Sequence, residues 1–329
     1  MMFDTRIVSP WHFAALLGVF VAVYALLYQL IKKRPVAWRV YSTGKPIYFI
    51  GWLLALVIMM PAAIILHDTN LVLGLIGSTI VVIIIGRLDE DQNISVRRQL
   101  FWQALIAAWA VYFGWTIPYI TNPFGSGVIV LSMGGLLAFA WLMVCMNAMN
   151  FLDGTDGLAT LVGIIAFVAL AGISLLPATQ DTTTFVMSLI AIGALLAFFL
   201  WNAPKARVYL GTSGSWFLGL FIGMTAMIGG GKIATACIVL AIPVLDALFV
   251  IVYRMVNHKN PTKGDTTSHI HHRLQRANIS PWGILLVLGV VTALLGIIAV
   301  VAPTYIKIIV LVLFACIFFV SRAITMKKV

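Results

Sequence analysis

Long runs of apolar residues, separated by short polar segments, make up most of this chain. A helix needs about 20 apolar residues to cross a lipid bilayer, and eleven runs come close to that length. They cover residues 11–31, 48–66, 71–86, 100–118, 128–149, 158–176, 185–201, 215–229, 233–253, 282–302 and 305–324. The pattern predicts an all-α polytopic integral membrane protein with about eleven transmembrane helices, in which residues 1–329 form a single domain.

The composition excludes a soluble protein. The chain is 62% hydrophobic and only 9% charged, whereas soluble domains are about 25% charged. Too few polar side chains therefore remain to cover a surface in water. The net charge of +11 does not point to nucleic acid, because basic residues of membrane proteins collect in cytosolic loops and face anionic lipid. We expect membrane lipids as partners and no nucleic acid.

The positions of the basic residues predict the orientation. If all eleven runs cross the membrane and the C-terminus is cytosolic, eighteen of the 21 Lys and Arg residues lie in cytosolic loops, and only Arg6, Lys232 and Lys307 lie outside. Such an excess of cytosolic positive charge is typical of multi-pass proteins. We therefore expect the N-terminus outside, the C-terminus in the cytosol, and a location in the inner (cytoplasmic) membrane.

A first acidic cluster, Asp89-Glu90-Asp91, lies between two apolar runs on the expected cytosolic side. One interpretation is a solvated acidic turn whose charge is balanced by neighbouring arginines. The other is chemical, because charged groups beside a bilayer are costly and tend to be functional. One carboxylate could accept a proton or orient a phosphate nucleophile, and its neighbour could help to hold a divalent cation.

A second polar segment places an Asn or Asp at every third position, together with Gly154 and Gly157. These residues are Asn147, Asn150, Asp153 and Asp156. Oxygen-bearing side chains at this density suit Mg²⁺ or the polar groups of a nucleotide, and glycines permit backbone turns that other residues resist. A turn capped by Asn and Asp is the alternative, although a cap does not need four such residues.

A third segment, residues 211–215, combines two glycines with the hydroxyls of Thr212, Ser213 and Ser215 at the start of an apolar run. Backbone N–H groups at a helix start can receive phosphate, and Lys205 could add positive charge. An ordinary loop explains this segment equally well.

A fourth segment gathers His269, His271, His272 and Arg273 in the longest expected cytosolic loop. Histidine beside arginine suits a pyrophosphate or a sugar, because both supply hydrogen-bond donors and positive charge. A zinc site with Asp265 and a basic loop resting on anionic lipid are the alternatives.

Asp246 lies within an apolar run. A carboxylate at that depth indicates function by default. It could instead pair with Arg254, two turns further along the same helix.

Taken together, these segments resemble the polyprenyl-phosphate N-acetylhexosamine-1-phosphate transferases, a family of integral membrane enzymes. Residues 147–159 match the family's Asn-x-x-Asn-x-x-Asp-Gly-x-Asp-Gly-Leu-Ala segment completely, and Asp89-Glu90 stands where the family has an Asp-Asp pair. Lys45-Pro46 looks like part of the family's first cytosolic loop. The segments 243–246 and 269–274 match as well, and the latter looks like the bacterial undecaprenyl-phosphate branch that uses UDP-GlcNAc or related sugars.

The resemblance implies transfer of a sugar-1-phosphate, expected to be N-acetylhexosamine-1-phosphate, from a UDP-sugar to a polyprenyl phosphate. UMP is released, and the product starts a lipid-linked glycan such as a cell-wall polymer or lipopolysaccharide. Mg²⁺, with Mn²⁺ as a substitute, is the implied cofactor, and the active site is expected at the cytosolic face of a homodimer. The implied catalytic residues are Asp89, Glu90, Asp153 and Asp156. The implied substrate-binding residues are Lys45, Asn147, Asn150, His269, His271, His272 and Arg273. The implied metal ligands are Asn150, Asp156 and Thr212.

Three positions depart from the family's pattern. Glu90 replaces the second Asp of the pair, and Asp265 lies four residues before His269 rather than three. At position 212 the chain has Thr where the family's Gly-Asp-x-Gly-Ser loop has an Asp that is taken as a Mg²⁺ ligand. A neutral hydroxyl binds Mg²⁺ less well than a carboxylate. The alternative function is therefore a catalytically impaired homologue that binds lipid-linked sugars or acts as a scaffold.

Overall fold

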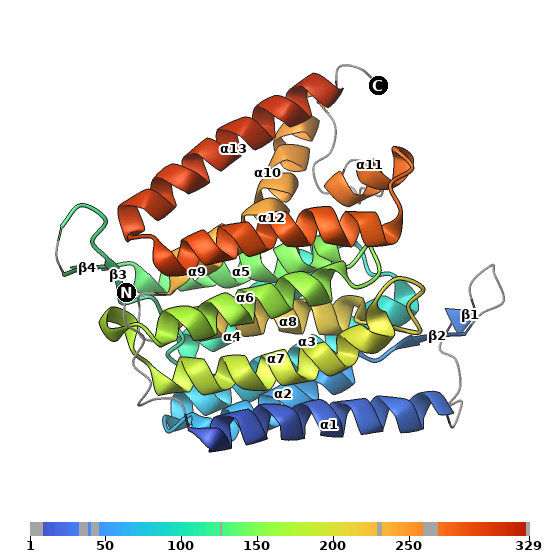
Figure 1. Ribbon diagram of the computed structural model, residues 1–329, viewed down its shortest axis with the longest axis horizontal. Coiled ribbons are helices and arrows are strands. Elements are labelled where there is room, and N and C mark those ends of the chain that lie inside the picture. Colours follow the sequence, from blue (N-terminus) through green and yellow to red (C-terminus); the bar gives the residue numbers. More distant parts are fainter. Residues whose placement is uncertain are drawn as a thin grey trace.

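Helices form nearly all of the computed structural model, which describes residues 9–32, 39–40, 46–125, 127–228, 232–258 and 269–326 (Figure 1). The helices of the first half are α1 (Pro10–Lys32), α2 (Gly51–Ile65), α3 (Thr69–Gln92), α4 (Val96–Tyr112), α5 (Gly134–Leu152) and α6 (Leu158–Ser174). Those of the second half are α7 (Thr182–Asn202), α8 (Gly211–Met227), α9 (Ile233–Val239), α10 (Ala241–Val256), α11 (Ile270–Arg276), α12 (Pro281–Val301) and α13 (Thr304–Met326). A short 3₁₀ helix, Pro177–Thr179, precedes α7.

The all-α prediction is confirmed, and each of the eleven apolar runs contains a helix or a pair of helices. The run at 233–253 is the divided one, because α9 and α10 meet at an angle of 68°. In the described part of the chain, five helices are long and apolar enough to cross a membrane, or six if this bent pair is one span. The protein is therefore a multi-pass membrane protein, while the count of eleven spans and the orientation of the termini stay predictions.

The main difference from the sequence prediction is the end of α3. We expected the run to end near residue 86 with the acidic cluster in the following turn, but the helix continues to Gln92 and carries the cluster in its last turns. The helix ends at Asn93, which has a left-handed φ of 49° and donates its N–H to the carbonyl of Asp89. Asp89 and Glu90 are each only 7% exposed, because this part of α3 packs against α8.

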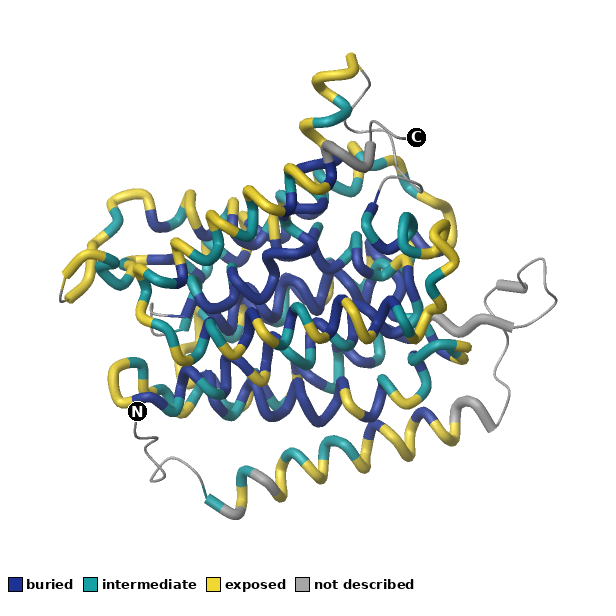
Figure 2. The backbone as a smooth tube through the Cα atoms, turned by 45° about the horizontal axis from the view of Figure 1, so that its top comes forward, coloured by how far each residue is buried: buried dark blue, intermediate teal, exposed yellow. Residues whose placement is uncertain are grey.

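The central element is α8, in which every residue except Thr212 is buried. It packs against α2, α3 and α5, and Figure 2 shows the buried middle of the molecule surrounded by more exposed helices such as α1. Glycines allow these helices to approach closely. A methyl group on Gly86 of α3 would lie 2.4 Å from the Ser213 Cα, and one on Gly219 of α8 would lie 2.3 Å from the Cys145 carbonyl oxygen of α5.

Two small sheets lie at opposite ends of the helix bundle (Figure 1). The first joins β1 (Arg39–Val40), β2 (Pro46–Phe49) and β5 (Val208–Tyr209). In this sheet β2 runs parallel to β5, with Tyr48 opposite Val208, so the chain that enters α2 lies beside the chain that enters α8. The second sheet is an antiparallel hairpin of β3 (Tyr119–Thr121) and β4 (Val128–Val130).

Two of the three basic residues expected outside are buried in the structure. Lys232, 1% exposed, donates to Asp181 Oδ2 at 2.7 Å and to the Ile228 carbonyl. Lys307, 5% exposed, donates to Thr235 Oγ1 at 3.2 Å. Each lysine thus connects neighbouring helices, and Figure 1 shows the start of α13 at the end of the molecule that carries β3 and β4.

Candidate active site

The first turn of α8 receives both acidic residues of α3. Asp89 Oδ2 accepts a hydrogen bond from the Thr212 hydroxyl at 2.5 Å, and Asp89 Oδ1 accepts one from the Gln99 side chain at 2.9 Å. Glu90 Oε1 accepts from both the N–H and the hydroxyl of Ser213, at 3.1 and 2.7 Å. The close α3–α8 contact at Gly86 makes these bonds possible, so the acidic pair and the 211–215 segment form one unit.

Glu90 is held from two sides. Its second oxygen, Oε2, accepts from Arg87 Nη1 at 2.7 Å. Arg87 also lies 3.8 Å from Asp91, which is half exposed. Since both oxygens of Glu90 already have donors, this side chain is arranged to fix the start of α8 rather than to exchange a proton with a substrate.

The last turns of α5 carry the two asparagines of the second polar segment. Asn147 donates from Nδ2 to Gln103 Oε1 of α4 at 2.7 Å and to the Met143 carbonyl at 2.8 Å. Asn150 lies one turn later and accepts a hydrogen bond from the Ser215 hydroxyl at 3.1 Å. Asn150 therefore faces α8, while Asn147 ties α5 to α4.

The segment between α5 and α6 makes a tight turn that brings Asp153 and Asp156 to the same region. The turn ends at Gly157, whose φ of +74° is readily adopted only by glycine. The Asp153 carboxyl lies near the backbone of Gly211, at the start of α8. Asp156 Oδ2 accepts from the backbone N–H groups of Lys205 and Ala206, both at 3.1 Å.

The histidine segment packs on this same turn. A methyl group on Gly154 would lie 2.6 Å from His271 Nε2, and Gln275 of α11 donates weakly to the Thr155 hydroxyl at 3.4 Å. His271 is 2% exposed. Burial, with smaller contributions from neighbouring His272 and His269, lowers the pKa of His271 to about 3, so its ring is neutral at physiological pH.

The other two histidines of the segment, His269 and His272, also have side-chain contacts. His269 Nδ1 lies 2.8 Å from Asp246 Oδ2 of α10, and its ring stacks on Phe151 of α5 at 4.9 Å between centroids. His272 Nδ1 lies 3.2 Å from Gln275 Oε1. Within the described residues, Asp246 therefore holds His269, and Phe151 joins the histidine segment to the Asn and Asp segment.

Two buried side-chain nitrogens in the histidine segment have no hydrogen-bond partner among the described residues. They are His271 Nε2 and Arg273 Nη1. A buried donor without a partner is unfavourable by roughly 1–3 kcal/mol, and more when it is charged. Both atoms lie in the segment that packs on the Asp153–Asp156 turn, which suits an anionic ligand at this place.

The carboxyl groups of Glu90, Asp153 and Asp156 lie close enough to affect one another. Burial raises the pKa of Asp153 well above its usual range, and the nearby charges of Glu90 and Asp156 raise it further. No group of three His, Cys, Asp or Glu side chains arranged for a metal is present in the described parts of the chain. A cation that prefers oxygen ligands would therefore need amide or substrate oxygens in addition to Asp153 and Asp156. The side-chain amide oxygen of Asn150 is the nearest such group along the sequence.

Comparison with known proteins finds a similar family. Residues 71–230, which contain the acidic pair, the Asn and Asp segment and the first turn of α8, match the model of glycosyl transferase family 4. Over this segment, about half of its length, the chain is similar to glycosyl transferase family 4. The relatives include an "Undecaprenyl-phosphate alpha-N-acetylglucosaminyl 1-phosphate transferase" of Thermotoga maritima, 30% identical over 62% of this chain and 62% of the relative.

Two further relatives have names that refer to N-acetylglucosamine and to N-acetylmuramoyl-pentapeptide. A "Probable undecaprenyl-phosphate N-acetylglucosaminyl 1-phosphate transferase" of Bacillus subtilis is 29% identical over 61% of this chain and 57% of the relative. A "Phospho-N-acetylmuramoyl-pentapeptide-transferase" of Leuconostoc mesenteroides is 28% identical over 66% of this chain and 70% of the relative. The chain thus spans about three fifths of the length of the two N-acetylglucosaminyl relatives.

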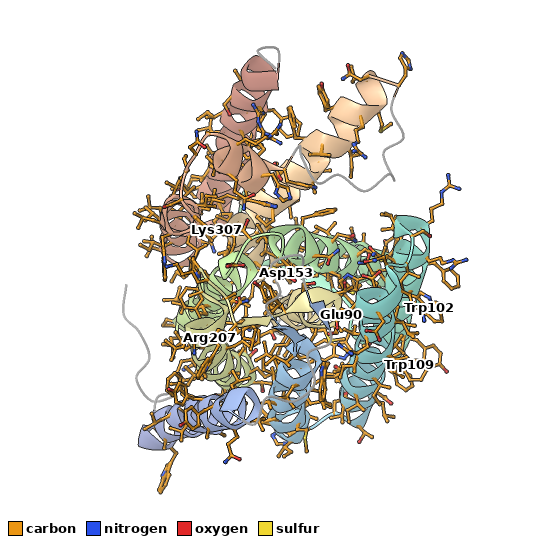
Figure 3. All side chains as sticks on the ribbon, turned by 90° about the vertical axis from the view of Figure 1, so that its right-hand side faces the viewer. Glu90, Trp102, Trp109, Asp153, Arg207 and Lys307 are labelled. Carbon is orange, nitrogen blue, oxygen red and sulfur yellow. The ribbon has the colours of Figure 1, made fainter. Side chains whose placement is uncertain are left out.

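Several of the predicted segments contact one another: Asp89 and Glu90 bond to the start of α8, Asn150 bonds to Ser215, and His271 packs on Gly154. Figure 3 shows Glu90 and Asp153 near each other at the end of the bundle that faces the viewer. Thr212, whose predicted role as a metal ligand stays a prediction, donates its hydroxyl to Asp89. Lys45 and Asp265 lie outside the described residues, so their predicted roles stay predictions.

The sequence analysis missed three residues that support the site. Gln99 and Gln103 hold Asp89 and Asn147, and their spacing of four residues on an otherwise apolar helix was the available signal. Arg322 of α13 lies 3.0 Å from Asp246 Oδ1, where the sequence had suggested Arg254 as the partner. Position alone gave no signal for Arg322, because it lies 76 residues from Asp246 along the chain.

Proposed function

We propose that this protein transfers N-acetylhexosamine-1-phosphate from a UDP-sugar to a polyprenyl phosphate at the cytosolic face of the inner membrane, and that UMP is released. Three curated relatives carry names for transfer to undecaprenyl phosphate or for a phospho-sugar transfer. The observation that carries the proposal is the contact between segments far apart in sequence. Asp153 lies near the backbone of Gly211, Asn150 accepts a hydrogen bond from Ser215, and His271 packs on Gly154, so carboxylates and the histidine segment lie at one place.

The proposed reaction forms and breaks one bond each at phosphorus. An oxygen of the polyprenyl phosphate attacks the β-phosphorus of the UDP-sugar, and the bond from that phosphorus to the bridging oxygen breaks, so UMP leaves. Such transfers depend mainly on positioning and on neutralising charge. The acceptor phosphate, with a second pKa near ~6, is already largely ionised at neutral pH. Asp89, held by Gln99 and Thr212, therefore serves to orient the acceptor rather than to deprotonate it.

The remaining residues take complementary roles in this proposal. Asp153, Asp156 and Asn150 would hold Mg²⁺, which would supply positive charge to neutralise the diphosphate. Arg273 and His271 offer their unpartnered donors to the phosphates or the sugar. Glu90 and Asn147 keep the starts and ends of the surrounding helices in place. The matching His-x-His-His-Arg-Leu segment favours a UDP-GlcNAc-like donor.

The test is a transfer assay on membranes that contain the protein, with UDP-GlcNAc labelled in the sugar and with added undecaprenyl phosphate. We expect a lipid-linked labelled product together with UMP. The Asp156→Asn variant should reduce the product by about 10²-fold or more, the usual effect of removing a group that stabilises charge in a transition state.

A matched control is Asp68→Asn. Asp68 caps the start of α3 and accepts from the N–H groups of Asn70 and Leu71, a role that Asn fills well, and it lies at the other end of that helix. Equal product from Asp156→Asn and Asp68→Asn would contradict the proposed site. No lipid-linked product from the wild-type protein with any UDP-N-acetylhexosamine would contradict the proposed reaction.

A further inference from the structure

Arg322 is a buried cation in the last helix of the chain. It is 5% exposed, although much of α13 around it is apolar and exposed, including Val312, Ile317 and Val320. Its guanidinium carbon lies 4.8 Å from the centre of the Phe249 ring, and Nη2 lies 3.0 Å from Asp246 Oδ1. A charge in an apolar helix is costly unless it is paired and usually has a function.

Asp246, the partner of Arg322, also contacts the histidine segment. It is 3% exposed and accepts from the Ile270 N–H, which begins α11, at 3.1 and 3.2 Å to its two oxygens. Its Oδ2 also lies 2.8 Å from His269 Nδ1. One buried carboxylate therefore joins Arg322 of α13 to both the backbone and the first ring of the histidine segment.

These contacts determine how His269 is presented. A carboxylate on Nδ1 fixes the tautomer and the ring orientation of a histidine, and it leaves Nε2 as the nitrogen available to a ligand. Phe151 stacks on one side of the ring, and the His271 ring lies parallel to it with centroids 6.0 Å apart. The ring of His269 is thus set by Asp246 and Phe151, and His271 follows from the same placement of α11.

We infer that Arg322 is a positioning residue for the UDP-sugar: it acts through Asp246 to orient His269 and to hold α11 against the Asp153–Asp156 turn. This inference rests on the proposed function for the identity of the ligand. Arg322 itself does not touch the proposed substrate site. The last helix therefore contributes to donor binding, although the family match ends at residue 230.

A purely structural role for Arg322 would give a different experimental result. If Arg322 only fastened α13 to α10, its loss would reduce the amount of folded protein and the apparent kcat in proportion, while KM for UDP-GlcNAc would not change. If Arg322 positions the histidine segment, its loss weakens UDP-GlcNAc binding in the protein that remains folded. The effect on KM for undecaprenyl phosphate should be small, because Asp89 and α3 are held by other contacts.

The experiment compares purified wild type, Arg322→Gln, Arg322→Lys and Lys307→Gln. Lys307 is the matched control, because it is also a buried cation of α13 but bonds to Thr235 at the far end of the helix. We expect KM and Kd for UDP-GlcNAc to rise roughly tenfold in Arg322→Gln, within the range typical of residues that orient a ligand-binding histidine. Arg322→Lys should recover most of this loss, and Lys307→Gln should leave both constants unchanged.

Equal Kd values for UDP-GlcNAc in wild type and Arg322→Gln, including no binding to either, would overturn the inference. If the wild type binds UDP-GlcNAc but makes no lipid-linked sugar, the proposed reaction fails, whereas the Kd comparison still decides the role of Arg322. If Arg322→Gln does not fold, Asp246→Asn provides the same measurement, since it keeps the side-chain volume but weakens the contacts to Arg322 and His269.

Discussion

Asp153 carries the least favourable charge of the proposed site. Burial raises the pKa of Asp153, and the nearby charges of Glu90 and Asp156 raise it further. Ionised Asp153 therefore destabilises the folded protein at pH values above the pKa that this residue has in the unfolded state. This destabilisation disappears as the pH falls and Asp153 takes up a proton. Without a cation at pH 7.5, we expect Asp153→Asn to raise Tm, by about 2–4 °C for each kcal/mol relieved. Thermal unfolding in detergent with EDTA measures this.

Added Mg²⁺ should stabilise the wild type but not Asp153→Asn. A ligand at ten times its Kd stabilises the folded state by about 1.4 kcal/mol, so the Tm of the wild type should rise with Mg²⁺ and that of Asp153→Asn should not. The same rise in both proteins would show that Asp153 does not hold the cation.

His271 should make stability depend on pH in the acid range. Burial lowers its pKa to about 3, whereas an unfolded histidine titrates near ~6.5. The folded state therefore disfavours the proton, and the stabilisation present above pH ~6.5 is lost as pH falls toward 3, by about 1.4 kcal/mol per pH unit. The Tm of the wild type should fall more between pH 7 and pH 5 than that of His271→Gln, which does not titrate. Parallel curves would exclude a buried neutral His271.

The contact between α3 and α8 is the element on which the acidic pair depends. Gly86→Ala would place a methyl group 2.4 Å from the Ser213 Cα and 2.5 Å from its N. Backbone atoms cannot rotate away, so the helices must separate, at a cost of about 1–3 kcal/mol. We expect a lower Tm and a loss of transfer activity, because Asp89 and Glu90 would lose their bonds to Thr212 and Ser213.

Gly18→Ala is the control for this prediction. No atom lies within 4 Å of a methyl group on Gly18 of α1, and alanine favours the helix by roughly 0.5–1 kcal/mol over glycine. Its Tm should equal or slightly exceed that of the wild type. A Gly86→Ala protein that is as stable and as active as Gly18→Ala would show that the α3–α8 contact is looser than the structure indicates.

At the level of elements, apolar run length predicted where helices lie but not how far they extend. Hydropathy falls at Arg87, which suggested a boundary, yet α3 continues because Ser213 and Thr212 supply donors for its last two buried carboxylates. Those donors are more than 120 residues away, so no local pattern reveals them. The bend between α9 and α10 was missed for a related reason, because the apolar run continues through Leu240 without a break.

The site residues were easier to predict than their partners. Asn147 to Asp156 stood out because polar residues are rare in this chain, and the structure brings this segment close to Gly211 and His271. What the sequence could not show is which polar residue binds which. Thr212 was considered as a metal ligand and proves to donate to Asp89, and Asp246 bonds to Arg322, which no spacing along the chain indicates.

Over the whole molecule, polar chemistry is divided between two ends. The end with Glu90, Asp153 and α11 holds carboxylates and unpartnered donors, whereas the charged residues Asp181, Lys232 and Lys307 are in ion pairs or hydrogen bonds that join helices. The hairpin of β3 and β4 exposes apolar side chains such as Phe124 and Val130, at 90% and 78%. The proposed use of a UDP-sugar predicts that the end with Glu90, Asp153 and α11 faces the cytosol.

The orientation can be tested with two single cysteines. Phe124 lies in the turn between β3 and β4, and Gln92 ends α3 beside the acidic pair; both are exposed. Between them lies α4, which has 17 residues and is about 25 Å long at 1.5 Å per residue; if α4 crosses the membrane, as the sequence pattern predicts, the two positions lie at opposite membrane surfaces. In a background without Cys145, Cys237 and Cys316, a membrane-impermeant maleimide should label Phe124→Cys in intact spheroplasts and Gln92→Cys only after permeabilisation. The reverse pattern would place the site outside the cell, where UDP-sugars are absent, and labelling of both in intact spheroplasts would contradict the separation of the two ends.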